Sequence, residues 1–137
     1  MNRRDFQALA NDRIREAKAL LDGRHYSGAY HLAGLAVECA LKACIAKQAK
    51  RHDFPDKKLA EQAWSHDLTG LRKLARLDVT FQADATMTPA LGINWGLVKD
   101  WTIDSRYQQK TAQQAADLYS AVHGRQTGVL RWIRQYW

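Results

Sequence analysis

The hydrophobic pattern is most informative between residues 26 and 46, in the run YSGAYHLAGLAVECALKACIA. On a helix of about 3.6 residues per turn, apolar side chains cover nearly every side of this segment. Its strongly polar residues, His31, Glu38 and Lys42, fall together on one narrow stripe. A helix with this pattern must be enclosed by other helices or by a partner chain. Because an unpaired buried carboxylate is costly, the pattern also predicts a partner for Glu38.

Apolar residues at three- and four-residue steps predict helices on both sides of this central one. A loop at Pro55 should follow the central helix, and the run WTIDSRYQ should form a corner. The segment DVTFQADATMTPALGIN is the least regular one, since Pro89 and Gly92 interrupt it. Two glycines, Gly124 and Gly128, are unfavourable in the middle of the last helix. The expected helices cover about residues 3–21, 27–50, a short piece of WSHDLTGLRKLARL, 89–101 and 111–136.

No segment alternates apolar and polar residues as a strand would, so we expect an all-α fold. The predicted architecture is an up-and-down bundle of about five helices that forms one domain over residues 1–137. The surplus apolar surface of the central helix, together with Trp132 and Trp137, predicts a homodimer. The alternative is that these aromatic side chains only cover the core of a monomer.

The composition adds a net charge of +7 and an isoelectric point of about 9.6. Such a balance favours polyanionic partners, namely RNA, DNA, nucleotides or an acidic protein. Small soluble domains also carry charges of this size, and the lysines and arginines are spread over every predicted helix. Charge alone therefore leaves a nucleotide or nucleic-acid partner open.

Both cysteines, Cys39 and Cys44, lie on the central helix. Five positions apart, their side chains point about 140° away from each other, so they cannot form a disulfide within the helix. This pattern predicts a reduced, cytoplasmic protein. The N-terminal sequence is too charged for a signal peptide. Glu38 and Lys42 oppose a membrane span, so we expect no membrane partner.

Several motifs occur in a combination that resembles the HEPN family of small helical bundles. They are AKALLDG at the end of the first helix, then Tyr26, AYHLAGLAVECALKACIAK, SHDLTGL, and WTIDSRYQ before the last helix. The resemblance implies a bundle that commonly pairs through its long helices. Many members of the family are metal-independent RNases, while others are partners of small nucleotidyltransferases or bind nucleotides without known catalysis. It also implies a context such as a toxin–antitoxin or phage-defence pair.

The catalytic members of this family carry an Arg followed, after four to six residues, by a His. Arg106 stands at the Arg position, but Thr111, Ala112 and Gln113 stand where the His belongs. RNA cleavage needs one group to take the 2′-OH proton and another to protonate the leaving oxygen, and His suits both roles. Arg stays charged and cannot exchange protons. The sequence therefore favours a non-catalytic HEPN-like module that binds a nucleotide, RNA or a partner nucleotidyltransferase.

Two other functions stay open at this point. One is a metal-independent endoribonuclease that uses Arg106 and a displaced His, with His66 as the first candidate. The other is a structural protein–protein adaptor, in which the polar stripe of the central helix only sets the register of the helices.

The residues expected at the ligand site are Glu38, Lys42, His66, Arg106 and Tyr107. Glu38 and Lys42 are spaced for an ion pair one turn apart, and Glu38 is a candidate anchor for Arg106 or His66. Arg106 would hold a phosphate, and Tyr107 would either stack on a base or fill the core. His66 precedes a short helix, where a His also commonly caps or packs. The histidines lack the spacing of metal ligands, so we expect no metal and no cofactor.

Overall fold

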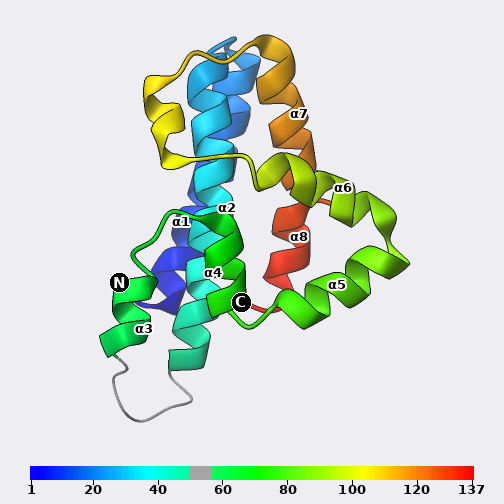
Figure 1. Cartoon of the computed structure of the whole chain (residues 1–137). Helices are drawn as coiled ribbons and strands as arrows, with labels where there is room; N and C mark the ends of the chain where they lie inside the picture. Colours follow the sequence, from blue (N-terminus) through cyan, green and yellow to red (C-terminus); the bar gives the residue numbers. More distant parts are fainter. Residues whose placement is uncertain (50–56) are drawn as a thin grey trace.

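A computed structural model describes residues 1–49 and 57–137. Over these residues the protein is all-α and has no strand. Eight α-helices and one 3-10 helix follow one another along this described part of the chain (Figure 1). Their bounds are α1 Arg3–Asp22, α2 Tyr26–Ala49, α3 Lys57–Gln62, α4 Leu68–Leu74, α5 Asp78–Met87, α6 Pro89–Val98, η1 Ile103–Tyr107, α7 Ala112–His123 and α8 Val129–Arg134.

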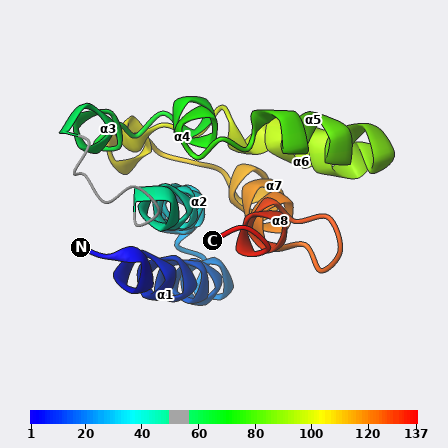
Figure 2. The ribbon, with the colours of Figure 1, turned by 90° about the horizontal axis from the view of Figure 1, so that it is seen from below.

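The helices lie in layers, which Figure 2 shows most clearly. α1 forms one outer layer, and α2 lies beside α7 and α8 in the middle. The other outer layer contains α3, α4, α5 and α6, of which α5 and α6 extend away from α2. α2 is therefore covered by α1 on one side and by α4 on the other, as a helix that is apolar on nearly every side requires.

The long hairpin of α1 and α2 begins with a capping box. The side chain of Asn2 accepts a hydrogen bond from the N–H of Asp5 at 3.0 Å, and the Asp5 carboxylate accepts one from the N–H of Asn2 at 2.9 Å. These bonds satisfy N–H groups that have no partner within the helix. The buried face of α1, formed by Ala10, Ile14 and Ala17, packs against α2. The first predicted helix is therefore confirmed, with its end shifted by one residue.

α2 is the central helix, and half of its 24 residues are buried. It is also the one helix in the described residues that is long and apolar enough to span a membrane. However, 67% of its most apolar stretch is buried inside the protein. Gly34 lies against the ring of Trp101, which a Cβ at this position would overlap. Trp101 is itself only 2% exposed. The missing side chain of Gly34 thus lets Trp101, two residues before η1, pack directly on α2.

The prediction of one continuous last helix is wrong. α7 ends at His123 and α8 begins at Val129. Between them Gly124 adopts an extended conformation, with φ −47° and ψ 136°, and its carbonyl accepts a hydrogen bond from the N–H of Gly128 at 3.1 Å. The backbones of these two glycines approach so closely that a Cβ on Gly128 would clash with Gly124. The low helix propensity of glycine and this tight turn explain the break.

The segment expected to be least regular forms α5 instead. The ring of Phe81 lies 5.5 Å, between centroids, from the rings of both Trp95 in α6 and Trp132 in α8. The Asp84 carboxylate accepts hydrogen bonds from Nε1 of Trp132 at 2.8 Å and from the Tyr136 hydroxyl at 3.0 Å. These contacts with residues distant in sequence stabilise a helix that the local pattern does not predict.

The number of helices is therefore a further correction, since the described chain has eight α-helices rather than about five. The split of the last helix, the presence of α5, and α3, which the pattern does not predict, account for the difference. The corner at WTIDSRYQ is confirmed, because η1 lies within it. The predicted loop at Pro55 lies outside the described residues.

Candidate functional site

Glu38 is a buried carboxylate in the middle of the polar stripe of α2, and it is 4% exposed. Nζ of Lys42 donates a hydrogen bond to its Oε1 at 2.9 Å. Nδ1 of His66 lies 2.9 and 3.0 Å from its two carboxylate oxygens. The predicted ion pair with Lys42 and the predicted contact with His66 are both present. These three residues, called the Glu38 cluster below, meet the requirement that a buried charge be paired.

His66 reaches Glu38 from the turn that precedes α4. The side-chain oxygen of Ser65 accepts a hydrogen bond from the N–H of Asp67 at 3.0 Å, which orders this turn. Asp67 is the N-cap residue of α4, but its side chain makes no capping hydrogen bond. The role of the turn is therefore to direct the imidazole of His66 onto α2.

Arg106 and Tyr107 lie in η1, at the other end of the stripe, and both are exposed. The Tyr107 side chain does not fill the core, because the residue is 78% exposed. The guanidinium carbon of Arg106 lies 4.7 Å from the centroid of the Tyr107 ring. Among the described residues, no carboxylate lies within ion-pair distance of Arg106. This cation therefore remains available to an anionic ligand.

The predicted contact between Glu38 and Arg106 does not form. Lys42 and His66 occupy the carboxylate of Glu38, and η1 contacts α2 at His31, nearer the start of the helix. On the stripe it is His31, two turns before Glu38, whose pKa is lowered by the charge of Arg106. The five predicted site residues thus divide into two groups, three in the Glu38 cluster and two in η1.

His31 is a site residue that the sequence analysis missed. Its Nδ1 lies 2.7 Å from the buried hydroxyl of Ser105 in η1. Burial lowers the pKa of His31, the charge of Arg106 lowers it further, and the carboxylate of Glu38 acts in the opposite direction. The imidazole is therefore mainly neutral at neutral pH. The available signal was its place on the same face as Glu38, but the pattern did not show which element would cover that face.

Lys110 adds a second cation to this end of α2. Its backbone N–H donates a hydrogen bond to the Ser27 hydroxyl at 2.8 Å. Its ammonium nitrogen lies 4.5 Å from the centroid of the Tyr30 ring, a cation–π contact. His31, Arg106, Tyr107 and Lys110, called the Arg106 corner below, combine two cations, an exposed ring and an imidazole.

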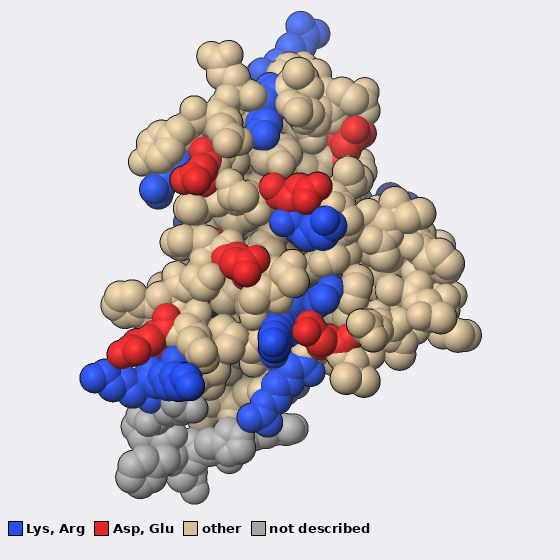
Figure 3. Space-filling view, in the orientation of Figure 1, with Lys and Arg blue, Asp and Glu red and all other residues tan. Residues whose placement is uncertain are grey.

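The charges elsewhere on the molecule do not form a single basic surface on the face that Figure 3 shows. Lys and Arg side chains alternate there with Asp and Glu side chains. The net charge of +7 is therefore not concentrated on this face. A local arrangement of a few groups, such as the Arg106 corner, must supply any specific recognition on it.

Neither a metal centre nor a reactive thiol is evident in the described residues. No three His, Cys, Asp or Glu side chains of these residues lie together in a way that could hold a metal ion. Cys39 and Cys44 are free, as their spacing on one helix predicts, and both are buried. Burial raises the pKa of Cys39 to about 11 and that of Cys44 to about 12, so both thiols stay protonated near neutral pH.

Protein-family models, curated proteins and solved structures were compared with this chain, and none of them matches it. The function must therefore be inferred from the geometry of the chain's own residues.

Proposed function

We propose that the protein is a HEPN-like, non-catalytic module that binds a nucleotide or single-stranded RNA at the Arg106 corner. One observation carries the proposal: the exposed ring of Tyr107 lies beside a guanidinium that has no carboxylate partner among the described residues. An exposed ring offers a stacking surface to a base, and a free guanidinium offers two parallel hydrogen bonds to a phosphate. Lys110 would add attraction for a second phosphate group.

The arrangement of the helices supports the HEPN-like part of this proposal. α1 and α2 form a long hairpin, and α7 packs along it (Figure 1). Glu38 lies on α2, and His66 and Arg106 lie on segments that contact α2. No His follows Arg106 at the family spacing, since Ala112 and Gln113 begin α7. This supports a binding role rather than catalysis.

A homodimer and a partner nucleotidyltransferase remain predictions. α6 carries exposed Ile93 and Leu97 one turn apart, and no charged residue occurs from Pro89 to Val98. An uncharged, apolar surface of this kind supports contact with a second protein chain. Sedimentation equilibrium would measure whether that chain is a second copy.

The proposal is tested by fluorescence-anisotropy titration of the protein with labelled ATP, GTP and short RNA oligomers at low salt. We expect saturable binding that Arg106→Ala and Tyr107→Ala each weaken by about tenfold, because a stacked base and a charged hydrogen bond each contribute roughly this factor. Binding should also weaken as salt is added, since phosphate contacts displace counterions.

Arg125→Ala is the matched control, because it removes one exposed arginine from the turn between α7 and α8. This variant should keep the wild-type affinity. If no probe binds the wild-type protein at low salt, or if Arg125→Ala weakens binding as much as Arg106→Ala, the proposal fails. The structural adaptor would then be the better interpretation.

The position of His31 favours one second candidate, a metal-independent endoribonuclease. In this candidate His31 would take the role first given to His66, because Nδ1 of His31 lies 2.7 Å from the hydroxyl of Ser105, the residue before Arg106, whereas Nδ1 of His66 contacts Glu38. A mainly neutral imidazole can take the proton of a ribose 2′-OH, after which the 2′-oxygen attacks phosphorus. The 5′-oxygen then leaves with a proton from solvent, and Arg106 would stabilise the negative charge on the phosphoryl group.

Incubation with end-labelled RNA separates this candidate from the binding module. The RNase predicts fragments with 2′,3′-cyclic phosphate ends that disappear in both His31→Ala and Arg106→Ala. Intact RNA with the wild-type protein, under conditions in which it binds, excludes the RNase and leaves the binding function.

A further inference from the structure

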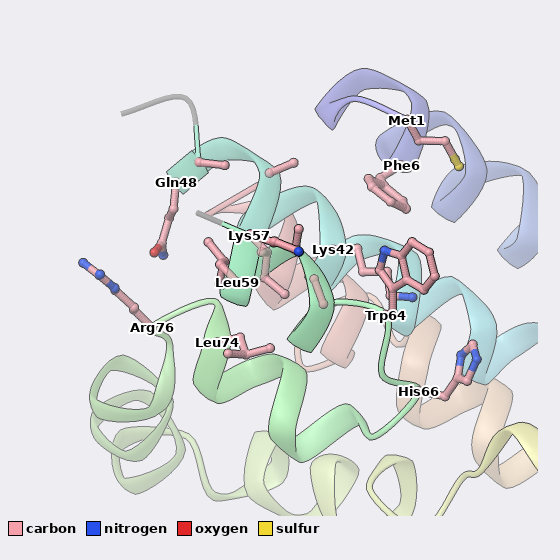
Figure 4. A pocket seen from close by; sticks show the side chains of 15 residues that line it. Met1, Phe6, Lys42, Gln48, Lys57, Leu59, Trp64, His66, Leu74 and Arg76 are labelled. Carbon is pink, nitrogen blue, oxygen red and sulfur yellow. The ribbon is translucent and has the colours of Figure 1, made fainter. Parts of the chain in front are cut away.

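A large pocket lies away from the Arg106 corner, between the start of α1, the C-terminal half of α2, α3 and α4 (Figure 4). Its volume is about 850 Å³. Pockets that hold small organic molecules commonly have volumes of about 300–1,000 Å³. The Glu38 cluster borders this pocket, because Lys42 and His66 are among the residues that line it.

The walls of the pocket are mainly apolar. Phe6 of α1, Ile45 of α2 and Leu74 of α4 contribute to them. Trp64, which follows α3, also lines the pocket although it is 82% exposed. A large apolar side chain that remains in water beside an apolar cavity indicates a surface that a ligand would cover.

The charged groups of this wall are all cationic in the described residues. They are Lys42, Lys57 and Arg76, and no Asp or Glu is among them. The charge of Lys42 is compensated by Glu38. Lys57 and Arg76 have no carboxylate within ion-pair distance among the described residues. The pocket therefore combines an apolar interior with two uncompensated positive charges.

The two ends of the pocket differ. Figure 4 shows Arg76 and Gln48 at one end and Trp64 and His66 at the other, with Lys57 between them. Arg76 directly follows the C-cap of α4 with a positive φ of 57°, a position that glycine commonly occupies. The amide of Gln48 is engaged with the carbonyl of Ala75, so the guanidinium of Arg76 is the main unpaired group at that end.

We propose that this pocket binds an amphipathic anion, namely an aliphatic carboxylate whose chain lies along the apolar walls. The carboxylate head lies near Lys57 in the middle of the pocket, and the chain extends toward Trp64, while Arg76 adds positive charge at the opposite end. Burial of the chain removes apolar surface from water, Lys57 supplies a charge-assisted hydrogen bond to the head, and Arg76 adds longer-range electrostatic attraction. A nucleotide fits this pocket less well, because the apolar walls offer few polar groups to bind a ribose and a base.

Isothermal titration calorimetry with decanoate tests the proposal, with decanol and decyltrimethylammonium as neutral and cationic probes of equal chain length. We expect decanoate to bind about tenfold more tightly than decanol, since charged hydrogen bonds contribute about this factor. Decyltrimethylammonium should bind more weakly than either. Decanoate should also shift the emission of Trp64 to shorter wavelength, and Trp64→Phe should remove that shift.

The double variant Lys57→Gln/Arg76→Gln should reduce the affinity for decanoate to that for decanol. Lys58→Gln/Lys73→Gln is the matched control, because it removes the same charge from α3 and from the last turn of α4, just before Arg76, at residues that do not line the pocket. It should leave decanoate binding unchanged. Arg106→Ala should do so as well, which separates this site from the nucleotide site proposed above.

Three results would overturn the proposal. The first is absence of decanoate binding to the wild-type protein, which would indicate that a protein segment or a second chain covers the apolar wall. The second is equal affinity for the three probes, which would show that the cations play no part. The third is equal loss of decanoate affinity in the two double variants, which would indicate an effect of net charge alone.

Discussion

The Glu38 cluster and the Arg106 corner lie against two parts of the same polar stripe of α2, which carries Glu38 and Lys42 in one and His31 in the other, yet they differ in charge balance. In the Glu38 cluster, a buried carboxylate contacts an ammonium and an imidazole. At the Arg106 corner, Arg106 and Lys110 lie near aromatic rings without a carboxylate partner among the described residues. A compensated, buried cluster is suited to holding helices together, whereas uncompensated, exposed cations are suited to a ligand.

His31 connects the two regions electrostatically. The charge of Arg106 lowers its pKa and that of Glu38 raises it, while burial is the largest influence. The two regions should therefore respond differently to mutation. Changes in the Glu38 cluster should mainly alter stability, and changes in the Arg106 corner should mainly alter binding and the titration of His31.

The largest expected effect is that of Glu38→Ala. Removing the carboxylate leaves the ammonium of Lys42 without its partner in a largely buried position. We expect a loss of about 3 kcal/mol in the free energy of unfolding, the lower end of the range for broken buried pairs, because Lys42 keeps some contact with solvent. Urea denaturation measures this change. Glu61→Ala, at an exposed position of α3, is the control and should change stability by less than about 0.5 kcal/mol. A urea midpoint of Glu38→Ala equal to that of the wild type would contradict a stabilising role of Glu38.

A smaller loss is expected for Gly34→Ala, which tests how the Arg106 corner is held on α2. The new methyl group would overlap the ring of Trp101, and overpacking of this kind costs about 1–3 kcal/mol. Thermal unfolding followed by circular dichroism would measure it. In Gly96→Ala the added Cβ meets no atom within 4 Å, so this helical position should gain about 1 kcal/mol. Loss of stability in both variants would show that the Trp101 contact is not the cause.

The smallest effect concerns the pKa of His31, measured by NMR titration of its ring protons. Arg106→Gln should raise this pKa, because a repelling charge is removed. Arg125→Gln removes a charge elsewhere in the chain and should leave it unchanged. An unaltered pKa in Arg106→Gln would show that the guanidinium does not act on His31.

The same lowered pKa makes stability depend on pH in a defined direction. At pH values between the pKa of His31 in the folded protein and its higher pKa in the unfolded chain, the unfolded chain binds more protons than the folded protein. The contribution of His31 to the free energy of unfolding is therefore complete at pH values above its pKa in the unfolded chain, about 6.5, and it decreases as the pH falls below that value. Urea midpoints of wild type and His31→Gln should accordingly converge on acidification, whereas a widening difference would indicate the opposite shift.

Much of the fold could be predicted from local patterns. The all-α class, the bounds of α1 and α2 to within a residue or two, and the corner around η1 follow from helical periodicity, caps and breakers. The pairing of Glu38 with Lys42 also follows from sequence, because residues one turn apart on a helix are neighbours in any fold. These features depend on contacts between residues close in the chain.

Only the tertiary structure decided the remainder. α5 depends on contacts of Phe81 and Asp84 with aromatic rings of α6 and α8, and these partners cannot be identified from the local sequence of α5. Likewise, the sequence placed His31, Glu38 and Lys42 on one face, but not which segment would cover each part of it. The packing of Trp101 on Gly34 set η1 over His31, and the turn before α4 brought His66 to Glu38. Periodicity reports the direction of a side chain from its own helix, whereas its partner is determined by how distant helices pack.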